Sequence, residues 1–137
     1  MSFILHSNLH SKSHVLDLEL CSVLLEDNRY FPWIFLVPRK NNIKKIIDLN
    51  SFDQQHLFLE LELAQKVMWN IFQPDQLNVA AIGNKTPQLH VHIIARYQND
   101  PAWPNTVWEF PGKIDYSPLE KEKVIKSLRA SFSENSF

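Results

Sequence analysis

The sequence predicts an α+β fold with a mainly antiparallel sheet of about five strands, one long central helix and a C-terminal helix. Short apolar stretches rich in β-branched and aromatic residues alternate with turn residues, which is typical of strands joined by hairpin-length connections. Residues 51–72 repeat apolar side chains at helical spacing, and a second helix start lies at 117–120. The length of 137 residues suits a single domain.

The first third of the chain predicts an arm followed by strands. Residues 1–12 are polar and indicate a short helix or a loosely held arm. Residues 14–25 alternate partly between apolar and acidic side chains, which indicates one or two strands. A turn is expected at 27–29, and the bulky apolar run Phe31–Val37 predicts a buried strand.

The central helix is the clearest element. Ser51 and Gln54 fit a capping box at its start, and Pro74 ends the segment. Between these points, apolar residues recur every three or four positions, at Leu57, Leu61, Ala64, Met68 and Phe72. This spacing predicts a helix over 51–72 that buries one face.

The remaining elements follow from the same kind of pattern. Leu77–Ile82 and Leu89–Ala95 indicate two strands, and 83–87 indicates the turn between them. A stretch rich in proline and tryptophan runs over 101–112. A second capping box, with proline at the first helical position, predicts a helix over 117–130.

Composition excludes several classes of protein. Fourteen basic and fifteen acidic residues give a net charge of −1, so we expect no nucleic-acid partner. Gly83 and Gly112 are the only glycines, which excludes the glycine-rich dinucleotide fingerprint and the P-loop. Cys21 is the only cysteine, as is typical of a reducing compartment. The N-terminus lacks a signal-peptide pattern, and the longest apolar run, Trp33–Val37, is too short to span a membrane. We therefore expect a cytoplasmic protein without a membrane partner.

The chemistry is concentrated in the segment Gln88-Leu89-His90-Val91-His92. Side chains on a strand alternate between its two faces, so the glutamine and both histidines should point one way and the aliphatic residues toward a core. Two imidazoles on alternate positions lie about 6–7 Å apart along a strand. That spacing suits two groups that bracket one phosphate, or two ligands of one metal.

The segment also carries a family resemblance. Gln88-φ-His90-φ-His92-φ-φ resembles the motif of the histidine triad (HIT) family, which reads His-φ-His-φ-His-φ-φ. Upstream, Asp27–Arg39 resembles the nucleotide-pocket strand of that family. Downstream, Asp100–Trp108 resembles a bacterial branch labelled HIT-family or diadenosine tetraphosphate hydrolases.

The resemblance extends over about 14–109, most of the chain. It implies one HIT-like domain over 1–137, composed of an N-terminal arm at 1–12, a HIT core at 13–109 and the C-terminal helix at 117–130. It also implies a homodimer, because that family usually forms one.

The resemblance implies hydrolysis or transfer of a nucleoside monophosphate group from a small nucleotide, either a dinucleoside polyphosphate or a nucleoside phosphoramidate, without a cofactor. His90 takes the place of the family's nucleophile, and a neutral imidazole is a good nucleophile near pH 7. His92 would donate a hydrogen bond to a phosphate oxygen, and Gln88 could donate its amide to another. The substrate-binding residues that we expect beside them are Asn84, Thr86, Trp33, Asn28 and Arg29.

Two departures from the family pattern leave an alternative open. Gln88 stands where the first histidine of the triad usually lies, and Trp33 stands where a fourth histidine is common upstream. Neither replacement can carry an imidazole proton. A nucleotide-binding or sensing module without catalytic activity is therefore the main alternative.

A metal-binding protein is a weaker alternative. His90 and His92 could provide two ligands, but a zinc site needs a third and a fourth. His6, His10 and His14 are spaced by four residues and would share one face if that segment were helical. We expect these three side chains to be exposed and the protein to bind no metal.

Four further side chains are assigned structural roles. Trp103 and Trp108 are interpreted as packing or dimer contacts rather than ligands. Arg39 and Arg96 end strands, and we expect both to be solvated rather than bound to phosphate.

Overall fold

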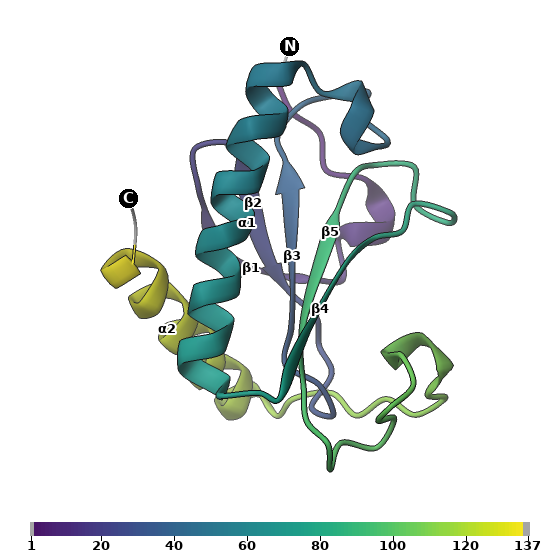
Figure 1. Ribbon diagram of the computed structural model, residues 1–137, viewed down its shortest axis with the longest axis vertical. Helices are drawn as coiled ribbons and strands as arrows, with labels where there is room; N and C mark the ends of the chain where they lie inside the picture. Colours follow the sequence, from purple (N-terminus) through teal and green to yellow (C-terminus); the bar gives the residue numbers. More distant parts are fainter. Residues whose placement is uncertain (1, 136–137) are drawn as a thin grey trace.

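The computed structural model describes residues 2–135, and its framework is one antiparallel sheet (Figure 1). The strands are β1 (Ser13–Asp17), β2 (Cys21–Leu25), β3 (Trp33–Pro38), β4 (Gln76–Ala81) and β5 (Val91–Arg96). Their order in the sheet is β1-β2-β3-β5-β4, and every neighbouring pair is antiparallel. The predicted α+β class is therefore confirmed, and the strand that carries the two histidines lies between two neighbours.

Two helices cover one face of the sheet. The long helix α1 (Ser51–Phe72) packs against β5, and the C-terminal helix α2 (Pro118–Asn135) packs beside it and against β1 (Figure 1). Both were expected, although α2 continues past the predicted end at residue 130. The predicted capping box of α1 is wrong by one residue, because the Asn50 side chain caps the helix by accepting from the Asp53 N–H at 2.8 Å.

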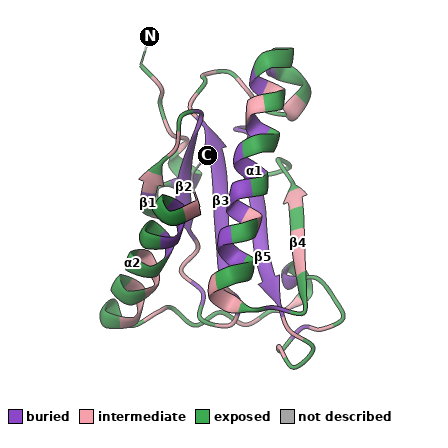
Figure 2. Ribbon diagram, turned by 60° about the vertical axis from the view of Figure 1, so that its left-hand side comes forward, coloured by how far each residue is buried: buried purple, intermediate pink, exposed green. Residues whose placement is uncertain are grey.

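The sheet separates two apolar clusters. Ile34, Leu36 and Ile93 point toward the helices, where they join the larger cluster. Phe35 and Ile94 point to the opposite face, where a smaller cluster forms. Figure 2 shows β2, β3 and β5 as buried throughout, whereas β4 at the edge of the sheet is mostly intermediate or exposed. The second face is the one toward which the histidines point.

The motif segment pairs in two different ways. The ladder of β5 begins at Val91, two residues later than the predicted strand start at Leu89. The Leu89 N–H instead donates to the Ile43 carbonyl at 2.9 Å, outside the ladder. The alternation of faces still continues through this irregular stretch, because Leu89 joins the helix-side cluster while His90 faces the other side with His92.

The N-terminal arm lies against the second face. It contains the 3-10 turn η1 (Ser7–Leu9), so a short helix was correctly expected. Leu9 is buried in the smaller cluster, and Phe3 and Leu5 pack against that cluster. The alternative of a loosely held arm is wrong, because the arm also bonds through its backbone to two distant side chains, Asn41 and Gln88.

The segment that follows β5 also covers the second face. Arg96 is only 2% exposed, so the expectation of a solvated side chain is wrong. Its guanidinium bonds both carboxylate oxygens of Asp100, at 2.8 and 3.0 Å, and the Asn78 side chain at 2.9 Å. Asp100 also accepts from the backbone N–H groups of Tyr97, Ala102 and Trp103, which fixes the start of the segment.

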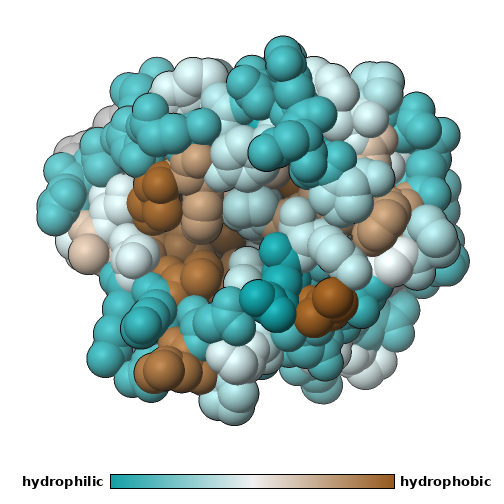
Figure 3. All heavy atoms as spheres, turned by 90° about the horizontal axis from the view of Figure 1, so that it is seen from below, coloured by the Kyte–Doolittle hydropathy of each residue, from teal (hydrophilic) through white to brown (hydrophobic). Residues whose placement is uncertain are grey.

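This segment continues through the 3-10 turn η3 (Val107–Glu109) before it reaches α2. Seen from the end of the molecule where α1 finishes, the surface is mostly hydrophilic, and apolar side chains gather around a hollow (Figure 3). No helix among the described residues is long and apolar enough to cross a membrane.

Candidate active site

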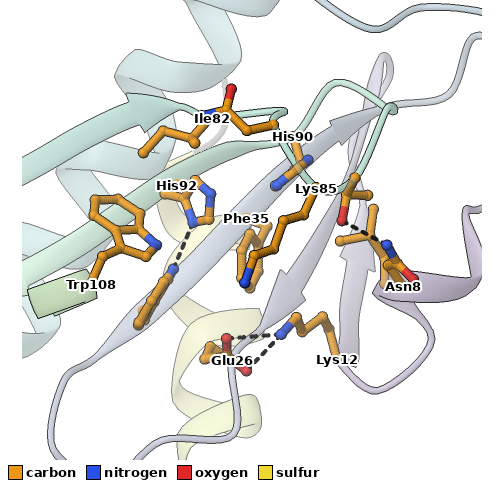
Figure 4. Close-up of a pocket in the computed structure, with 13 residues that line it drawn as sticks. Asn8, Lys12, Glu26, Phe35, Ile82, Lys85, His90, His92 and Trp108 are labelled. Atoms are coloured by element: carbon orange, nitrogen blue, oxygen red, sulfur yellow. Dashed lines mark hydrogen bonds and ion pairs between the residues drawn. The ribbon is translucent and has the colours of Figure 1, made fainter. Parts of the chain in front are cut away.

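A cavity of about 640 Å³ opens on the sheet face opposite the helices. Its volume lies within the range of ordinary small-molecule sites. The arm, β3, β5, the turn before β5 and η3 all contribute to its walls (Figure 4). The lining residues are Asn8, Leu9, Lys12, Glu26, Trp33, Phe35, Ile82, Asn84, Lys85, Thr86, His90, His92 and Trp108.

His90 is held in one tautomer by its own backbone neighbour. Its Nδ1 atom lies 2.7 Å from the carbonyl oxygen of Gln88. A carbonyl oxygen can only accept, so this nitrogen carries the ring proton. The Nε2 atom of a neutral His90 ring therefore keeps its lone pair, which makes it the candidate nucleophile of the cavity.

His92 is held in the opposite tautomer by a side chain. The indole N–H of Trp33 donates to His92 Nδ1 at 3.0 Å, and an indole N–H can only donate. Nδ1 is thus unprotonated, and a neutral ring carries its proton on Nε2. Burial of the ring, together with repulsion from His90 and Lys12, lowers the pKa of His92 from 6.5 to about 3. At neutral pH this residue is an uncharged hydrogen-bond donor.

The two rings therefore offer complementary chemistry in one cavity. Their centroids are 5.0 Å apart and their planes are inclined at 65°. Both are almost fully buried, with exposed fractions of 7% for His90 and 6% for His92. One ring presents a lone pair and the other an N–H, so a phosphate between them can be attacked by the first and hydrogen-bonded by the second.

An aromatic frame surrounds His92. Its ring centroid lies 4.9 Å from that of Phe35 and 5.0 Å from that of Trp108, which stands edge-on at 90°. Trp33 contacts both His92 and Trp108 at 5.7 Å between ring centroids. Trp33 thus lies where a substrate-binding residue was expected. Trp108 also lines the cavity, although the sequence indicated a packing or dimer contact.

The turn before β5 brings three side chains to the cavity. Asn84 and Thr86 line it, as expected of substrate-binding residues, and Lys85 lies between them. In Figure 4, Lys85 extends from this turn into the cavity. Its ammonium group is a cation at the site that was not predicted.

Three of the predicted site residues are not brought into the cavity. Asn28 is buried elsewhere, and its side chain accepts from the Tyr30 N–H at 3.0 Å. Arg29 forms an ion pair with Glu120 of α2 at 3.5 Å. The Gln88 side chain bonds to the backbone of the arm and does not line the cavity.

Three of the lining residues that sequence reasoning missed lie on the arm, namely Asn8, Leu9 and Lys12. Lys12 forms an ion pair with Glu26 in the cavity wall, and its Nζ atom lies 2.9 and 3.0 Å from the two carboxylate oxygens. A signal for this pair was present. Lys12 directly precedes β1 and Glu26 directly follows β2, and Ser13 pairs with Leu25 in that hairpin. Opposite charges at the open end of a hairpin are neighbours.

The metal alternative gains no support from the described residues, which contain no group of three or more His, Cys, Asp or Glu side chains placed to hold an ion. The three N-terminal histidines do not share one helical face. His6 caps η1, His10 bonds the Leu5 carbonyl, and His14 lies on β1 paired with Asp17.

Replacing Trp33 by Phe is expected to lower kcat about 10- to 100-fold. The change keeps an aromatic ring but removes the donor that fixes the His92 tautomer. Nitrogen NMR shifts of the ring should then show the proton shared between Nδ1 and Nε2. Trp108→Phe is the matched control, because that indole faces the same ring edge-on without a hydrogen bond to it. An unchanged tautomer in Trp33→Phe would contradict the assignment.

The environment of His92, including its hydrogen bond from Trp33, predicts how the stability of the protein depends on pH. The pKa of His92 is about 3 in the folded protein against 6.5 ordinarily, so the unfolded chain binds more protons between these values. The contribution of His92 to the free energy of unfolding should be fully present above about pH 6.5 and should be lost as the pH decreases toward 3. Trp33→Phe removes a donor that favours the unprotonated ring, so its melting temperature should decline less steeply over this window.

Comparisons with known proteins identify one family. The HIT domain family model matches residues 9–99. A histidine triad protein of Bradyrhizobium japonicum is 38% identical over 96% of this chain and 99% of its own, with a TM-score of 0.93. A histidine triad protein of Marinobacter aquaeolei VT8 is 36% identical, with 99% and 100% of the two chains covered and a TM-score of 0.94. One from Sinorhizobium meliloti 1021 is 33% identical over 97% and 96%, with a TM-score of 0.87. No curated protein matches the chain.

Proposed function

The chain belongs to the histidine triad (HIT) domain family, and on that premise we propose that it cleaves small nucleotides at the α-phosphate, as a phosphohydrolase or nucleotidyl transferase. The observation that carries the proposal is the pair of fixed tautomers. His90 offers a lone pair on Nε2, and His92 offers an N–H on its own Nε2, within one cavity.

The reaction runs in two displacements. The Nε2 lone pair of His90 attacks the α-phosphorus and forms an N–P bond, while the bond from phosphorus to the leaving group breaks and the leaving group takes its electron pair. Water then attacks the same phosphorus and gives up a proton to solvent, the N–P bond breaks with its electron pair returning to His90 Nε2, and the nucleoside monophosphate leaves. His92 donates its Nε2–H to a phosphate oxygen in both steps, where negative charge grows.

The charges at the cavity favour an anionic substrate. Lys12 forms an ion pair with Glu26 at 2.9 Å, whereas no partner within bonding distance is found for Lys85 among the described residues. Asn84 and Thr86 flank this free cation in the same turn. We propose that these residues bind the phosphate chain or leaving group of a dinucleoside polyphosphate or a nucleoside phosphoramidate.

A nucleotide-binding or sensing module without turnover is the second candidate, and one observation favours it. The two residues that replace family histidines both direct their hydrogen bonds away from a substrate. Trp33 donates its single N–H to His92, and Gln88 uses its amide oxygen and one of its two N–H groups on the arm and does not line the cavity. Neither side chain therefore donates a hydrogen bond into the cavity.

Turnover of wild-type protein separates the two candidates. Purified protein is incubated with diadenosine tetraphosphate and, separately, with adenosine 5′-phosphoramidate, and the release of AMP is followed. A sample quenched early under mildly alkaline conditions is searched by mass spectrometry for an AMP adduct on His90. Product and adduct support the enzyme. AMP that binds and stabilises the protein, with no product from either substrate, would establish the sensing module.

We further propose that the protein is a cytoplasmic homodimer. Helix α1 exposes large apolar side chains on its outer side, and β4 leaves one edge of the sheet unpaired, both of which suit a second copy. The exposed apolar residues of α1 are Phe52, Phe58, Leu59 and Trp69. The proposed location is supported by Cys21, which is buried and unpaired and so suits a reducing compartment.

Sedimentation velocity tests the dimer. Phe58 and Trp69 lie about three helical turns apart on the same side of α1, so Phe58→Glu with Trp69→Glu places two charges in the proposed interface. This variant should sediment as a monomer, whereas the wild type and the control Leu119→Glu, on α2, should sediment as dimers. A monomeric wild type would refute the dimer and leave the chemistry untouched.

A further inference from the structure

The Gln88 side chain is engaged by the N-terminal arm at both ends of its amide. Its Oε1 atom accepts from the His6 backbone N–H at 2.7 Å, and its Nε2 atom donates to the Ile4 carbonyl at 2.9 Å. The orientation of the amide is unambiguous, because a backbone N–H can only donate and a carbonyl can only accept. Residues more than eighty positions apart are thereby joined directly beside the motif.

This is the most protected of the contacts that fasten the arm. Gln88 is only 9% exposed. Three further side-chain contacts lie at the surface: Asn8 Nδ2 donates to Thr86 Oγ1 at 3.1 Å, and Asn41 bonds the backbone of Ile4 at 3.0 Å and of Ser2 at 2.8 Å. The ion pair of Lys12 with Glu26 is partly buried and holds the far end of the arm. Exposed hydrogen bonds compete with water, so the Gln88 amide should contribute more to holding the arm than the three surface contacts.

The arm that Gln88 fastens forms one wall of the cavity. Asn8, Leu9 and Lys12 all line it, and Leu9 is buried against the sheet. The Nζ atom of Lys12 lies 5.3 Å from the centroid of the Phe35 ring, which itself packs against both histidines. Repulsion from Lys12 contributes to the lowered pKa of His92, so the charge of this residue is felt at the catalytic pair.

We propose that Gln88 is a positioning residue that holds the arm as a wall of the active site, and that the arm in turn places Lys12 to bind the negative charge of the nucleotide. Gln88 then acts through Lys12 and does not touch the substrate. This inference rests on the proposed function. It replaces the role that the family resemblance suggested for Gln88, which was to donate a hydrogen bond to a phosphate oxygen.

Glutamine suits this task for a chemical reason. The arm presents one donor and one acceptor side by side, and a neutral amide is complementary to both. A carboxylate has no donor, so Gln88→Glu would place an anionic oxygen against the Ile4 carbonyl at nearly constant volume. The backbone carbonyl of residue 88, which fixes the His90 tautomer, is retained in every variant.

Gln88→Glu is therefore the sharpest test, with Gln88→Ala as a second variant in case the charge prevents folding. The control is Gln65→Glu, the same change on α1 away from the cavity. Hydrogen exchange should show loss of protection at the His6 amide in both Gln88 variants but not in the control. KM for diadenosine tetraphosphate should rise about 10-fold while kcat changes less than about threefold, because the histidine pair is untouched.

A double-mutant cycle with Lys12→Ala identifies the route of the effect. If Gln88 acts through Lys12, each single variant should raise KM. The KM of the double variant should then be no higher than that of the Lys12→Ala single variant. Additive losses, a fall in kcat, or a protected His6 amide in Gln88→Glu would each overturn the proposal. If wild-type protein shows no turnover, the proposed enzyme fails, and the same cycle is read from the Kd of AMP, which does not depend on catalysis.

Discussion

His90→Asn is expected to lower kcat at least about 10³-fold while nucleotide binding is retained. The asparagine amide still has an N–H that can reach the Gln88 carbonyl, so the local backbone contact can persist. It has no basic lone pair with which to attack phosphorus. The AMP adduct should disappear together with turnover, whereas the Kd of AMP should change less than about threefold.

The matched control is His14→Asn. His14 lies on β1, is paired with Asp17 and does not line the cavity, so the same replacement there should leave kcat and KM unchanged. Substantial turnover by His90→Asn would contradict the nucleophile assignment even if the wild type is active. An adduct that persists in this variant would point to a different attacking group.

The sequence correctly predicted those features that depend on one short segment. Period-two alternation placed His90 and His92 on one face and Val91 and Ile93 on the other, and the structure confirms this. The helical spacing over 51–72 likewise gave both ends of α1, although Asn50 and not Ser51 provides the cap. Such patterns are local, since they follow from the geometry of a single strand or helix.

The errors concern side chains whose partners the sequence pattern does not specify, whether those partners are near or distant in the sequence. Asn28 and Arg29 lie near the cavity strand in sequence, but one caps a local turn and the other pairs with α2. The polar arm gave no periodic signal, and its place beside Gln88 depends on hydrogen bonds across more than eighty residues. A motif shows which residue types are present, but the partner of an amide or a guanidinium is decided by the tertiary fold.

Arg96 is the clearest case, and replacing it by Met is expected to cost about 3–5 kcal/mol of stability. The side chains of Arg96 and Asp100 are each only 3% exposed, so removal of the cation leaves a buried carboxylate without its charged partner. For a chain of this length, the melting temperature should fall by roughly 10–20 °C. Lys66→Met, which breaks the exposed pair with Glu62 on α1, should cost less than about 1 kcal/mol.

Acid should weaken the ion pair between Arg96 and Asp100. Burial alone would raise the pKa of Asp100, but the hydrogen bonds from Arg96 and from three backbone N–H groups outweigh it and hold the pKa below its ordinary value. The unfolded chain therefore binds the proton more readily. This contribution to stability is complete above the unfolded pKa of about 3.9 and is lost as the pH falls through the lower folded value.

Loss of Arg96 should also weaken nucleotide binding at temperatures at which the protein is still folded. Asp100 fixes the start of the segment that continues to Trp108, and Trp108 packs edge-on against His92. Well below its melting temperature, Arg96→Met should therefore bind AMP more weakly than the wild type, whereas Lys66→Met should not. Adding Asp100→Asn removes the stranded charge, keeps an acceptor for the backbone N–H groups, and should recover part of both losses. Equal stability of the single and double variants would show that the unpaired carboxylate is not the cause.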